Sequence, residues 1–406
     1  MPKPLTKDCS VLVVGAGPTG LAAAATLAKL GISVRVIDKN QERSDKSKAL
    51  GVQAGTLECL DAVFGFQLSE EMVKTGRPAK EAWIHLEDKE PMKVNLSSIP
   101  SRYNYILVLE QSETERLLEK ELNRLGVQVE RQTELMTATE NGTIINSTIK
   151  RITGETSHVE SEFVIGCDGA HSTVRRLLGM PFEGAAYDGE FILGDVKIEL
   201  PWSYNTTHSY ICKRGIAICF PMKGEQKYRL ILIPKSGDVS SNTTDISLEE
   251  FRSIAKSIFL DKIKILESTW LTRFKVHHRM TREFQKGRFF LAGDAAHIHS
   301  PAGGQGMNIG IQDAINLAYK IKQVVDGQKP FSHLANYQKE RMPVARNVLK
   351  STDFIFKHAL LPESSLLAIA GKAILPHLVR STWIQQRVAL AMSEVNVARR
   401  EIQHYS

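Results

Sequence analysis

Short apolar runs alternate with an Ala- and Leu-rich segment at the start of the chain. Residues 11–14 predict a buried strand, and residues 21–30 have the composition and apolar spacing of a helix. Residues 33–37 predict a second strand. Strand, helix and strand in this order predict a βαβ unit, whose two strands lie parallel in one sheet.

The middle of the chain changes from this pattern to a succession of strands. Before the change, the pattern predicts one helix and two short strands, at residues 112–125, 127–129 and 163–165. After about Phe182 it predicts three successive strands, at residues 191–200, 209–220 and 228–234. Successive strands without intervening helices predict an antiparallel sheet inserted between the elements of the first domain.

Toward the C-terminus, residues 289–293 predict a further buried strand and residues 306–325 a helix. From residue 337 onward the pattern is helical, with segments such as 364–378 and 383–399 and with breaks expected near Pro343, Leu361–Pro362 and Pro376. We therefore expect an α/β fold in three parts: residues 1–181 with 275–350, an inserted β-sheet domain at 182–274, and a C-terminal helical segment at 351–406 that bridges the two.

Composition and charge narrow the possible partners. The chain has 406 residues, of which 42% are hydrophobic and 24% charged, as in ordinary globular proteins. The net charge of +7 is compatible with binding nucleic acid or anionic cofactors. However, acidic and basic residues are interspersed and no long basic tract occurs, so a solvated surface is favoured and nucleic acid is not an expected partner.

Cysteine usage and apolar segments indicate the compartment. The five cysteines are widely spaced and lack paired C-x-x-C motifs, which argues against a disulfide framework and a zinc site. Residues 10–30 are mostly apolar, but the interrupting glycines favour a strand–turn–helix unit over a signal peptide. No other apolar run is long enough to span a bilayer. We expect a cytoplasmic monomer or homodimer without stable membrane insertion.

The first chemical motif is a glycine triplet, Gly15-x-Gly17-x-x-Gly20, between a predicted strand and a predicted helix. The first glycine permits a tight turn, the second lets a pyrophosphate approach the backbone, and the third lets helix and strand pack closely. The helix N-terminus favours anions. Asp38 closes the second strand at the distance expected for an acid that binds ribose hydroxyls. The motif predicts a dinucleotide site, whereas a tight turn without ligand is the alternative.

A second motif, Gly166-Cys167-Asp168-Gly169, follows another predicted strand. Asp-Gly after a strand normally indicates a turn, so a hairpin or a helix cap would explain it in isolation. Arg175 and Arg176 follow shortly afterwards and are compatible either with phosphate binding or with a solvated helix face.

The third motif runs from the strand at Phe289 through Gly293-Asp294 into the glycine-rich stretch before Asn308. An acid at the end of a strand can bind a polyol, and the helix that follows offers N–H groups to an electron-rich partner. His297 and His299 are compatible with a metal site, but a structural histidine is favoured, and no metal is expected.

These three motifs, in this order, resemble the GxGxxG, DG and GD fingerprints of the single-component (class A) FAD-dependent aromatic hydroxylases, in particular their polyketide-type branch. Residues 48–58, 111–118 and 337–343 also resemble family segments, so the resemblance extends over roughly residues 8–350. It implies a Rossmann-like FAD-binding domain of the GR2 type with an inserted antiparallel sheet.

The resemblance also implies positions along the cofactor. The glycine triplet would hold the FAD diphosphate, Asp38 the adenosine ribose and Asp294 the ribityl chain, while the loop with Pro301, Gly303 and Gly304 would shield the flavin ring. The implied FAD-binding set is Gly15, Gly17, Pro18, Thr19, Gly20, Asp38, Lys39, Lys48, Gln53, Gln111, Asp168, Gly293, Asp294, Pro301, Gly304, Gly306, Met307 and Asn308.

Two positions depart from the branch, because many polyketide-type relatives have Arg where this chain has Lys48 and Gly55. A lysine cannot reproduce the two-pronged contact of a guanidinium, so the pyrophosphate contacts there are in question. The rest of the chemistry implied by the resemblance is unaffected. The resemblance implies that NADPH or NADH would reduce FAD and that O2 would then form a flavin C4a-hydroperoxide. The protein would supply position and shielding instead of a catalytic side chain.

The substrate is the least determined part of the prediction. Phe220, Met222 and Arg229 on the inserted sheet are candidate substrate contacts, with ordinary core or surface roles as the alternative, and His208 and Tyr210 are weaker candidates. A helical C-terminal segment resembles that of the tetracycline-inactivating flavin monooxygenases, which implies a tetracycline substrate and antibiotic resistance. A phenol or polyketide hydroxylase of a catabolic or biosynthetic pathway, another flavin enzyme on the same fold and a flavin-binding protein without catalysis remain as alternatives.

Overall fold

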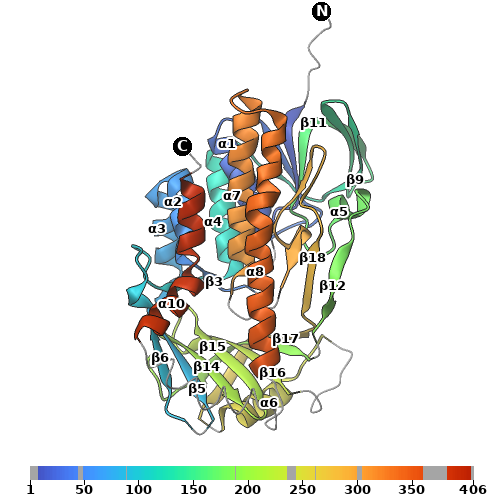
Figure 1. Ribbon diagram of the computed structural model, residues 1–406. Helices are drawn as coiled ribbons and strands as arrows, with labels where there is room; N and C mark the ends of the chain where they lie inside the picture. The colour runs from blue at the N-terminus through green and yellow to red at the C-terminus, as the bar shows by residue number, and fades with distance from the viewer. Residues whose placement is uncertain are drawn as a thin grey trace, which may run out of the picture.

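The computed structural model describes residues 8–43, 49–87, 89–187, 189–235, 244–260, 262–299, 304–359 and 382–403. Figure 1 shows an upper part, in which helices pack around a mainly parallel sheet, and a lower part built on an antiparallel sheet. The upper part combines segments from both ends of the chain, and the lower part is inserted between them. This architecture confirms the predicted α/β fold class.

Parallel strands form the centre of the upper sheet. Their order is β20, β11, β1, β2, β8, and each neighbouring pair runs parallel. Their bounds are β1 Cys9–Val14, β2 Val34–Ile37, β8 Val129–Glu130, β11 Thr156–Gly166 and β20 Phe289–Leu291. The antiparallel additions are β9 Thr133–Asn141, β10 Ile144–Arg151 and β19 Gln285–Lys286. The predicted βαβ unit is confirmed, with α1 (Pro18–Lys29) connecting β1 to β2.

Small residues let the helices of the upper part approach one another closely. Residues 22–25 of α1 are alanines without exposed surface. Gly310, on α7 (Gly306–Val325), lies so near α1 that a Cβ there would come within 2.4 Å of the Thr19 hydroxyl. The other helices of this part are α2 Ala54–Phe64, α3 Phe66–Thr75, α4 Gln111–Arg124 and α5 Thr173–Leu177. The predicted helices at 112–125 and 306–325 are confirmed as α4 and α7.

The lower part is a seven-stranded sheet in the order β17, β13, β16, β15, β14, β5, β6. Its strands are β5 Glu81–Leu86, β6 Met92–Asn95, β13 Phe191–Glu199, β14 Thr206–Cys212, β15 Gly215–Pro221, β16 Lys227–Pro234 and β17 Lys264–Phe274. The sequence pattern predicted no strand at β5 or β6, which join the sheet because β5 pairs in parallel with the distant β14. β5 and β6 pair antiparallel with each other, and the parallel pairing of β5 with β14 is a long-range contact that no local pattern indicates.

The single strand predicted at 209–220 is wrong. The structure divides this segment into β14 and β15, which pair antiparallel with Cys212 opposite Gly215. Lys213 and Arg214 form the tight turn between them, and both are exposed. Gly215 has a φ of 150°, and a Cβ there would come within 2.3 Å of the Ile233 carbonyl oxygen. The two apolar segments on either side of Lys213 and Arg214 therefore form a hairpin, whose two-residue turn is basic and lacks the usual turn residues.

The two faces of the lower sheet have different coverings. Helix α6 (Leu248–Phe259) packs on one face, where Phe251 and Phe259 are fully buried. Figure 1 places α6 at the foot of the molecule, on the side away from the upper part. The opposite face carries a second apolar cluster with the partly buried side chains of Ile218, Phe220 and Trp270. This second face is therefore the one turned toward the upper part.

Two small sheets join the parts. One consists of β3 (Gly51–Val52), β7 (Ile106–Val108) and β4 (Arg77–Ala79), and β4 leads within two residues into β5. The other consists of β12 Phe182–Ala186, β18 His277–Thr281 and β21 His297–Ile298. Connections of the chain between upper and lower parts therefore run through short, paired strands.

The C-terminal helices return to the upper part. Helix α8 (Ala335–Ala359) runs through Pro343, so the break predicted there is wrong. Pro343 is exposed, while Arg341, Met342 and Ala345 around it are buried, so packing offsets the loss of one helical hydrogen bond. The segment 364–378 and the breaks predicted at Leu361–Pro362 and Pro376 lie outside the described residues.

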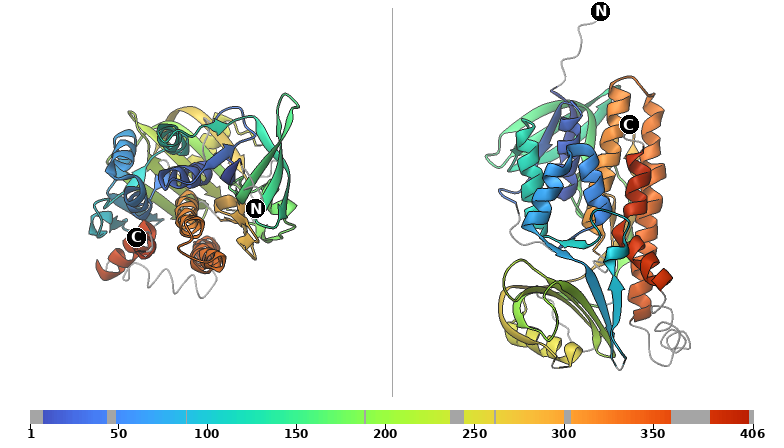
Figure 2. Two further views of the ribbon diagram at one scale, coloured as in Figure 1. Left: turned by 90° about the horizontal axis from the view of Figure 1, so that it is seen from above. Right: turned by 90° about the vertical axis from the view of Figure 1, so that its left-hand side faces the viewer.

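The segment predicted as one helix at 383–399 consists of α10 (Thr382–Ser393) and α11 (Val395–Ile402). The two helices are separated by Glu394, which has the left-handed φ of 57°. Helix α11 packs against α2, and α10 contacts β6 of the lower sheet. Figure 2 shows both helices (red) beside α8 (orange).

The contact between α2 and α11 depends on Gly55. A Cβ at this position would lie 2.6 Å from both the carbonyl carbon and the carbonyl oxygen of Glu394. Backbone atoms cannot move aside cheaply, so we expect Gly55→Ala to lower the free energy of unfolding by about 1–3 kcal/mol. Chemical denaturation measures this loss. Gly51→Ala is the control, because its Cβ would meet nothing closer than 3.7 Å, and an equal loss in both variants would contradict the explanation.

Candidate functional site

The glycine triplet forms the turn between β1 and α1, and a side chain would have a different consequence at each of the three positions. Gly15 has a φ of 101°, and a Cβ there would come within 2.5 Å of the Cys167 carbonyl oxygen. A Cβ at Gly20 would come within 1.9 Å of the Gly15 carbonyl oxygen. A Cβ at Gly17, in contrast, would have no heavy atom within 4 Å. Gly15 and Gly20 therefore permit packing, and Gly17 leaves open space at the start of α1.

A cleft of about 210 Å³ lies beside this turn, and residues of the first and second motifs line it together, including Gly15, Gly17, Asp38, Lys39 and Asp168. The Asp38 carboxylate accepts hydrogen bonds from the backbone N–H groups of Ala16 (2.7 Å) and Asn40 (2.8 Å). Asp38 therefore connects the end of β2 to the glycine turn at the position from which an acid can reach a ribose.

Asp168, from the second motif, also lines the cleft. One of its carboxylate oxygens accepts hydrogen bonds from the backbone N–H groups of Thr173 (2.6 Å) and Val174 (3.2 Å), at the start of α5. The other oxygen is buried and has no hydrogen-bond partner within the protein. Burial raises the pKa of Asp168, although the hydroxyl of Ser172 and nearby backbone N–H groups act to lower it. This orphaned oxygen fits a site that accepts a hydroxyl or another donor from a ligand.

The third motif packs directly on the first. Gly293 has a φ of 59°, and a Cβ there would come within 2.5 Å of the Thr19 hydroxyl. The turn that follows β20 buries Gly293, Ala295 and His297 and leaves Asp294 exposed. The predicted positions Thr19, Gly293 and Asp294 are thus brought together, with Asp294 extending from the packed turn.

Asn308 joins two loops that were predicted to line the cofactor. Its Oδ1 accepts a hydrogen bond from the Gln53 N–H (2.8 Å), and its Nδ2 donates to the carbonyl oxygens of Gly51 (2.9 Å) and Gly304 (2.8 Å). Asn308 has no exposed surface. The segment at 51–53 and the start of α7, with Gly306 and Met307, are therefore held against each other.

Gln53 and Gln111 differ in their surroundings. The Gln53 side chain is buried, and its carbonyl oxygen lacks a partner within the protein, which fits a ligand donor nearby. Gln111 lies at the start of α4 and donates to Glu115 at 2.9 Å. Lys48, Pro301 and Gly303 lie outside the described residues.

Arg175 has neither of the roles that the sequence left open. It is buried, and its guanidinium donates to the carbonyl oxygens of Ala295 (2.9 Å) and Ala170 (2.7 Å) while lying over the Phe182 ring. It connects the second motif to the third as a structural residue. Arg176 is exposed and lies on the solvated face of α5.

A buried polar cluster behind the third motif was missed in the sequence. The Asp313 carboxylate on α7 accepts hydrogen bonds from the Gly293 N–H (3.2 Å) and the Arg341 Nε (2.6 Å), and lies 2.7 Å from the His297 Nε2. Burial acts to raise the pKa of Asp313, but the Arg341 guanidinium and His297 lower it below its ordinary value. His297 is therefore a structural histidine, as favoured. The signal available in the sequence was that Asp313 is the single acidic residue of the helix predicted at 306–325.

The candidate substrate residues lie at the junction of the two parts. Phe220 and Met222 pack with Leu50 and Val108 of the upper part. Arg229, opposite Phe220 in the sheet, is buried and forms a two-pronged ion pair with Asp195 at 2.6 and 2.7 Å. The structure brings these three residues together at one junction.

The weaker candidates lie on the other face of the lower sheet. Tyr210 packs against Phe259 of α6, and the His85 ring stacks on Tyr210 with ring centroids 4.1 Å apart. His208 lies 2.9 Å from His85, nitrogen to nitrogen, and burial lowers the pKa of both histidines to about 4. His208 and Tyr210 therefore are not grouped with Phe220.

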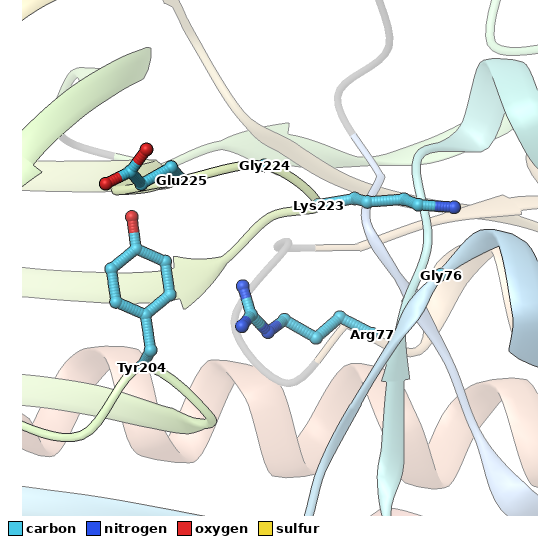
Figure 3. A pocket seen from close by; sticks show the side chains of 6 residues that line it. All are labelled: Gly76, Arg77, Tyr204, Lys223, Gly224 and Glu225. Atoms are coloured by element: carbon cyan, nitrogen blue, oxygen red, sulfur yellow. The ribbon is translucent and has the colours of Figure 1, made fainter.

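A separate hollow of about 460 Å³ contains none of the predicted residues (Figure 3). Figure 3 shows the Arg77 and Tyr204 side chains within it and Lys223 extending away from them. Arg77 donates to the Asn205 side chain (3.0 Å) and to the Met222 carbonyl oxygen (3.1 Å). The Arg77 guanidinium therefore holds β4 against the lower sheet through these hydrogen bonds.

A glycine turn at the carboxyl end of parallel strands, with an acid ending the second strand, defines a dinucleotide-binding protein. The chain belongs to the family described as FAD binding domain, whose model matches residues 8–352. This match, with the relatives below, confirms the resemblance to the FAD-dependent aromatic hydroxylases. The orphaned oxygens of Asp168 and Gln53 and the open space at Gly17 fit such a cofactor.

Two relatives match most of the chain. The 6-methylpretetramide 4-monooxygenase of Streptomyces rimosus is 35% identical over 84% of this chain and 60% of that protein. The pentachlorophenol 4-monooxygenase of Sphingobium chlorophenolicum is 33% identical over 85% of this chain and 64% of that protein. The chain thus spans less than two thirds of either relative.

A solved structure agrees with the fold. The OxyS anhydrotetracycline hydroxylase from Streptomyces rimosus superimposes with a TM-score of 0.76 at 28% identity, over 95% of this chain and 76% of that one. Within the described part of the chain, no helix combines the length and apolar character required to cross a membrane.

Glu394 accepts a hydrogen bond from Gln312, the residue before Asp313, and its pKa provides a test of how deeply this region is buried. Burial raises its pKa to about 8. Below about pH 4 both folded and unfolded states hold the proton, and up to about pH 8 only the unfolded state releases it, so wild-type stability falls over this interval and then levels off. We expect the free energy of unfolding of Glu394→Gln to rise relative to that of the wild type as the pH increases from about 4 to about 8.

Unfolding free energies at about pH 5, 7 and 9 measure this difference. Glu225→Gln, on an exposed turn, is the control for a general effect of removing one carboxylate. A difference between wild type and Glu394→Gln that stays constant with pH would contradict the assignment.

Proposed function

We propose that the chain is an FAD-dependent monooxygenase that uses NADPH or NADH and O2 to hydroxylate a polycyclic aromatic substrate of the polyketide type, most specifically a tetracycline, which it would inactivate. The observation that carries the proposal is the meeting of all three motifs around the start of α1. Two of the relatives described above are named for substrates of the tetracycline type, which supports this substrate class.

In this proposal, each motif binds one part of FAD. The open space at Gly17 and the N-terminus of α1 accept the diphosphate, because free N–H groups and the helix dipole favour anions. Asp38 binds the adenosine ribose and Asp294 the ribityl chain. The loop anchored by Asn308 and the start of α7 face the flavin ring. When bound and reduced, FAD supplies the reaction of O2 with the substrate.

In this proposal, the lower sheet forms the wall of the substrate site that faces the flavin. Its face with Ile218, Phe220 and Trp270 is apolar and turned toward the upper part. A flat, mostly apolar substrate fits such a face, and apolar walls also exclude water from the reaction. Arg229 is neutralised by Asp195, so in this proposal it supports the floor of the pocket and leaves substrate contact to Phe220 and Met222.

A phenol hydroxylase is the second candidate, favoured by the relative named for pentachlorophenol. A flavin-binding protein without catalysis is the candidate from another class. Oxidation of NADPH or NADH and uptake of O2 by the purified protein, with tetracyclines and simple phenols, separate the three. We expect a mass gain of one oxygen atom on a tetracycline and loss of its antibiotic action.

Three other outcomes of these measurements would change or overturn the proposal. One added oxygen on a phenol but none on a tetracycline would replace the substrate and retain the monooxygenase. FAD binding without substrate-dependent oxidation of NADPH or NADH would leave only a binding protein. Absence of FAD binding would overturn the proposal.

Asp294 tests the cofactor assignment at one residue. We expect Asp294→Asn to weaken FAD binding about tenfold, because a charged acceptor for a hydroxyl is lost. Its exposure predicts little change in the stability of the FAD-free protein. Flavin fluorescence titration measures the affinity. Asp326→Asn, an exposed acid at the other end of α7, is the control, and equal affinities in the two variants would contradict the assignment.

A further inference from the structure

Two buried glutamates of the C-terminal region are connected to α7, Glu394 by a direct contact and Glu401 through Arg341 of α8. Glu394, just before α11, accepts a hydrogen bond from the Gln312 Nε2 at 2.6 Å. Glu401, on α11, accepts one from the Arg341 guanidinium, which in turn donates to Asp313 at 2.6 Å. Each of the two glutamates exposes only 5% of its surface. Helix α11 is thus connected by polar groups to the interior of the upper part.

The contact through Arg341 continues to the third motif. Asp313 accepts the Gly293 N–H and pairs with His297, and these two residues flank Asp294 in the turn after β20. Arg341, Asp313 and His297 are at most 1% exposed. Water cannot replace a lost partner at this depth, so removing one group leaves an uncompensated buried charge on the next.

The same guanidinium also reaches the other cofactor-facing segment. Arg341 Nη2 donates to the Ile309 carbonyl oxygen at 3.2 Å. Ile309 directly follows Asn308, the residue that joins the loops at 51–53 and 304. One side chain therefore contacts α11, the turn with Asp294 through Asp313, and the first turn of α7.

We propose that Glu401 is a positioning residue for FAD, and that its buried contact with Arg341 sets the order of the turn at 293–297 through Asp313. The proposal rests on the proposed function, because it concerns the FAD site. Glu401 itself acts through two other residues. Its loss loosens the turn and weakens FAD binding, whereas loss of a contact that merely holds α11 in place does neither.

The chain offers a matched control for this distinction. Arg399, also on α11, forms an ion pair with Glu58 of α2, with nitrogen–oxygen distances of 3.0 and 3.1 Å. This contact holds α11 from its exposed side and does not involve α7 or the turn. Arg399→Gln therefore removes a fastening of α11 without interrupting the buried connection.

The experiment compares Glu401→Leu, Glu401→Gln and Arg399→Gln by amide hydrogen exchange, with and without FAD, and by FAD titration. In Glu401→Leu we expect exchange at the Gly293 and Ala296 amides to rise about tenfold and FAD affinity to fall about tenfold. Gln keeps an acceptor for Arg341 and gives a smaller effect. In Arg399→Gln the increase is confined to α11.

Two results would overturn the proposal: an exchange increase in Glu401→Leu that is confined to α11, or equal effects of Glu401→Leu and Arg399→Gln on the turn. If Glu401→Leu does not fold, Glu401→Gln decides, since exchange at Gly293 must rise more in it than in Arg399→Gln. Should the wild type bind no FAD, the proposed function fails, and exchange in the FAD-free proteins still tests the connection.

Discussion

The ion pair between Arg341 and Asp313 is the interaction on which the arrangement of the upper part depends. Both groups are almost fully buried, and the charge of each is compensated only by the other and by the side chains around them. Burial alone would lower the pKa of Arg341, but Glu401 and Asp313 together raise it, so the Arg341 guanidinium stays protonated. Because one missing partner would leave a bare charge in the core, α7, α8, α11 and the turn after β20 have to assemble together.

The glycine motifs could be interpreted from the sequence because their constraints are local. A turn that places Gly15 against Cys167 or Gly293 against Thr19 excludes every side chain, and this exclusion leaves a pattern in one sequence. The fold class and the strand and helix that frame each motif followed from the same short-range pattern. The predicted FAD contacts remain predictions, although the structure places most of the described ones around the start of α1.

What the sequence could not reveal depends on distant partners. The partners of Asp313 are Arg341 and His297, and only the folded chain brings them together. Strands β5 and β6 show the same limit, since the five strands that complete their sheet begin at residue 191 or later. Pro343 illustrates the reverse case, in which a local rule predicted a break and the burial of its neighbours prevailed.

The paired connections between the two parts also determine how these parts can move. One pair runs through β4 and the segment before β7, and the other through β12 and β18. Two attachment sites define a line, so relative motion of the lower sheet is reduced largely to rotation about that axis, and sliding is resisted by the strands at both ends. Helix α10 contacts β6 of the lower sheet and so opposes such rotation. The lower sheet would therefore move relative to the upper part mainly by hinge rotation about this one axis.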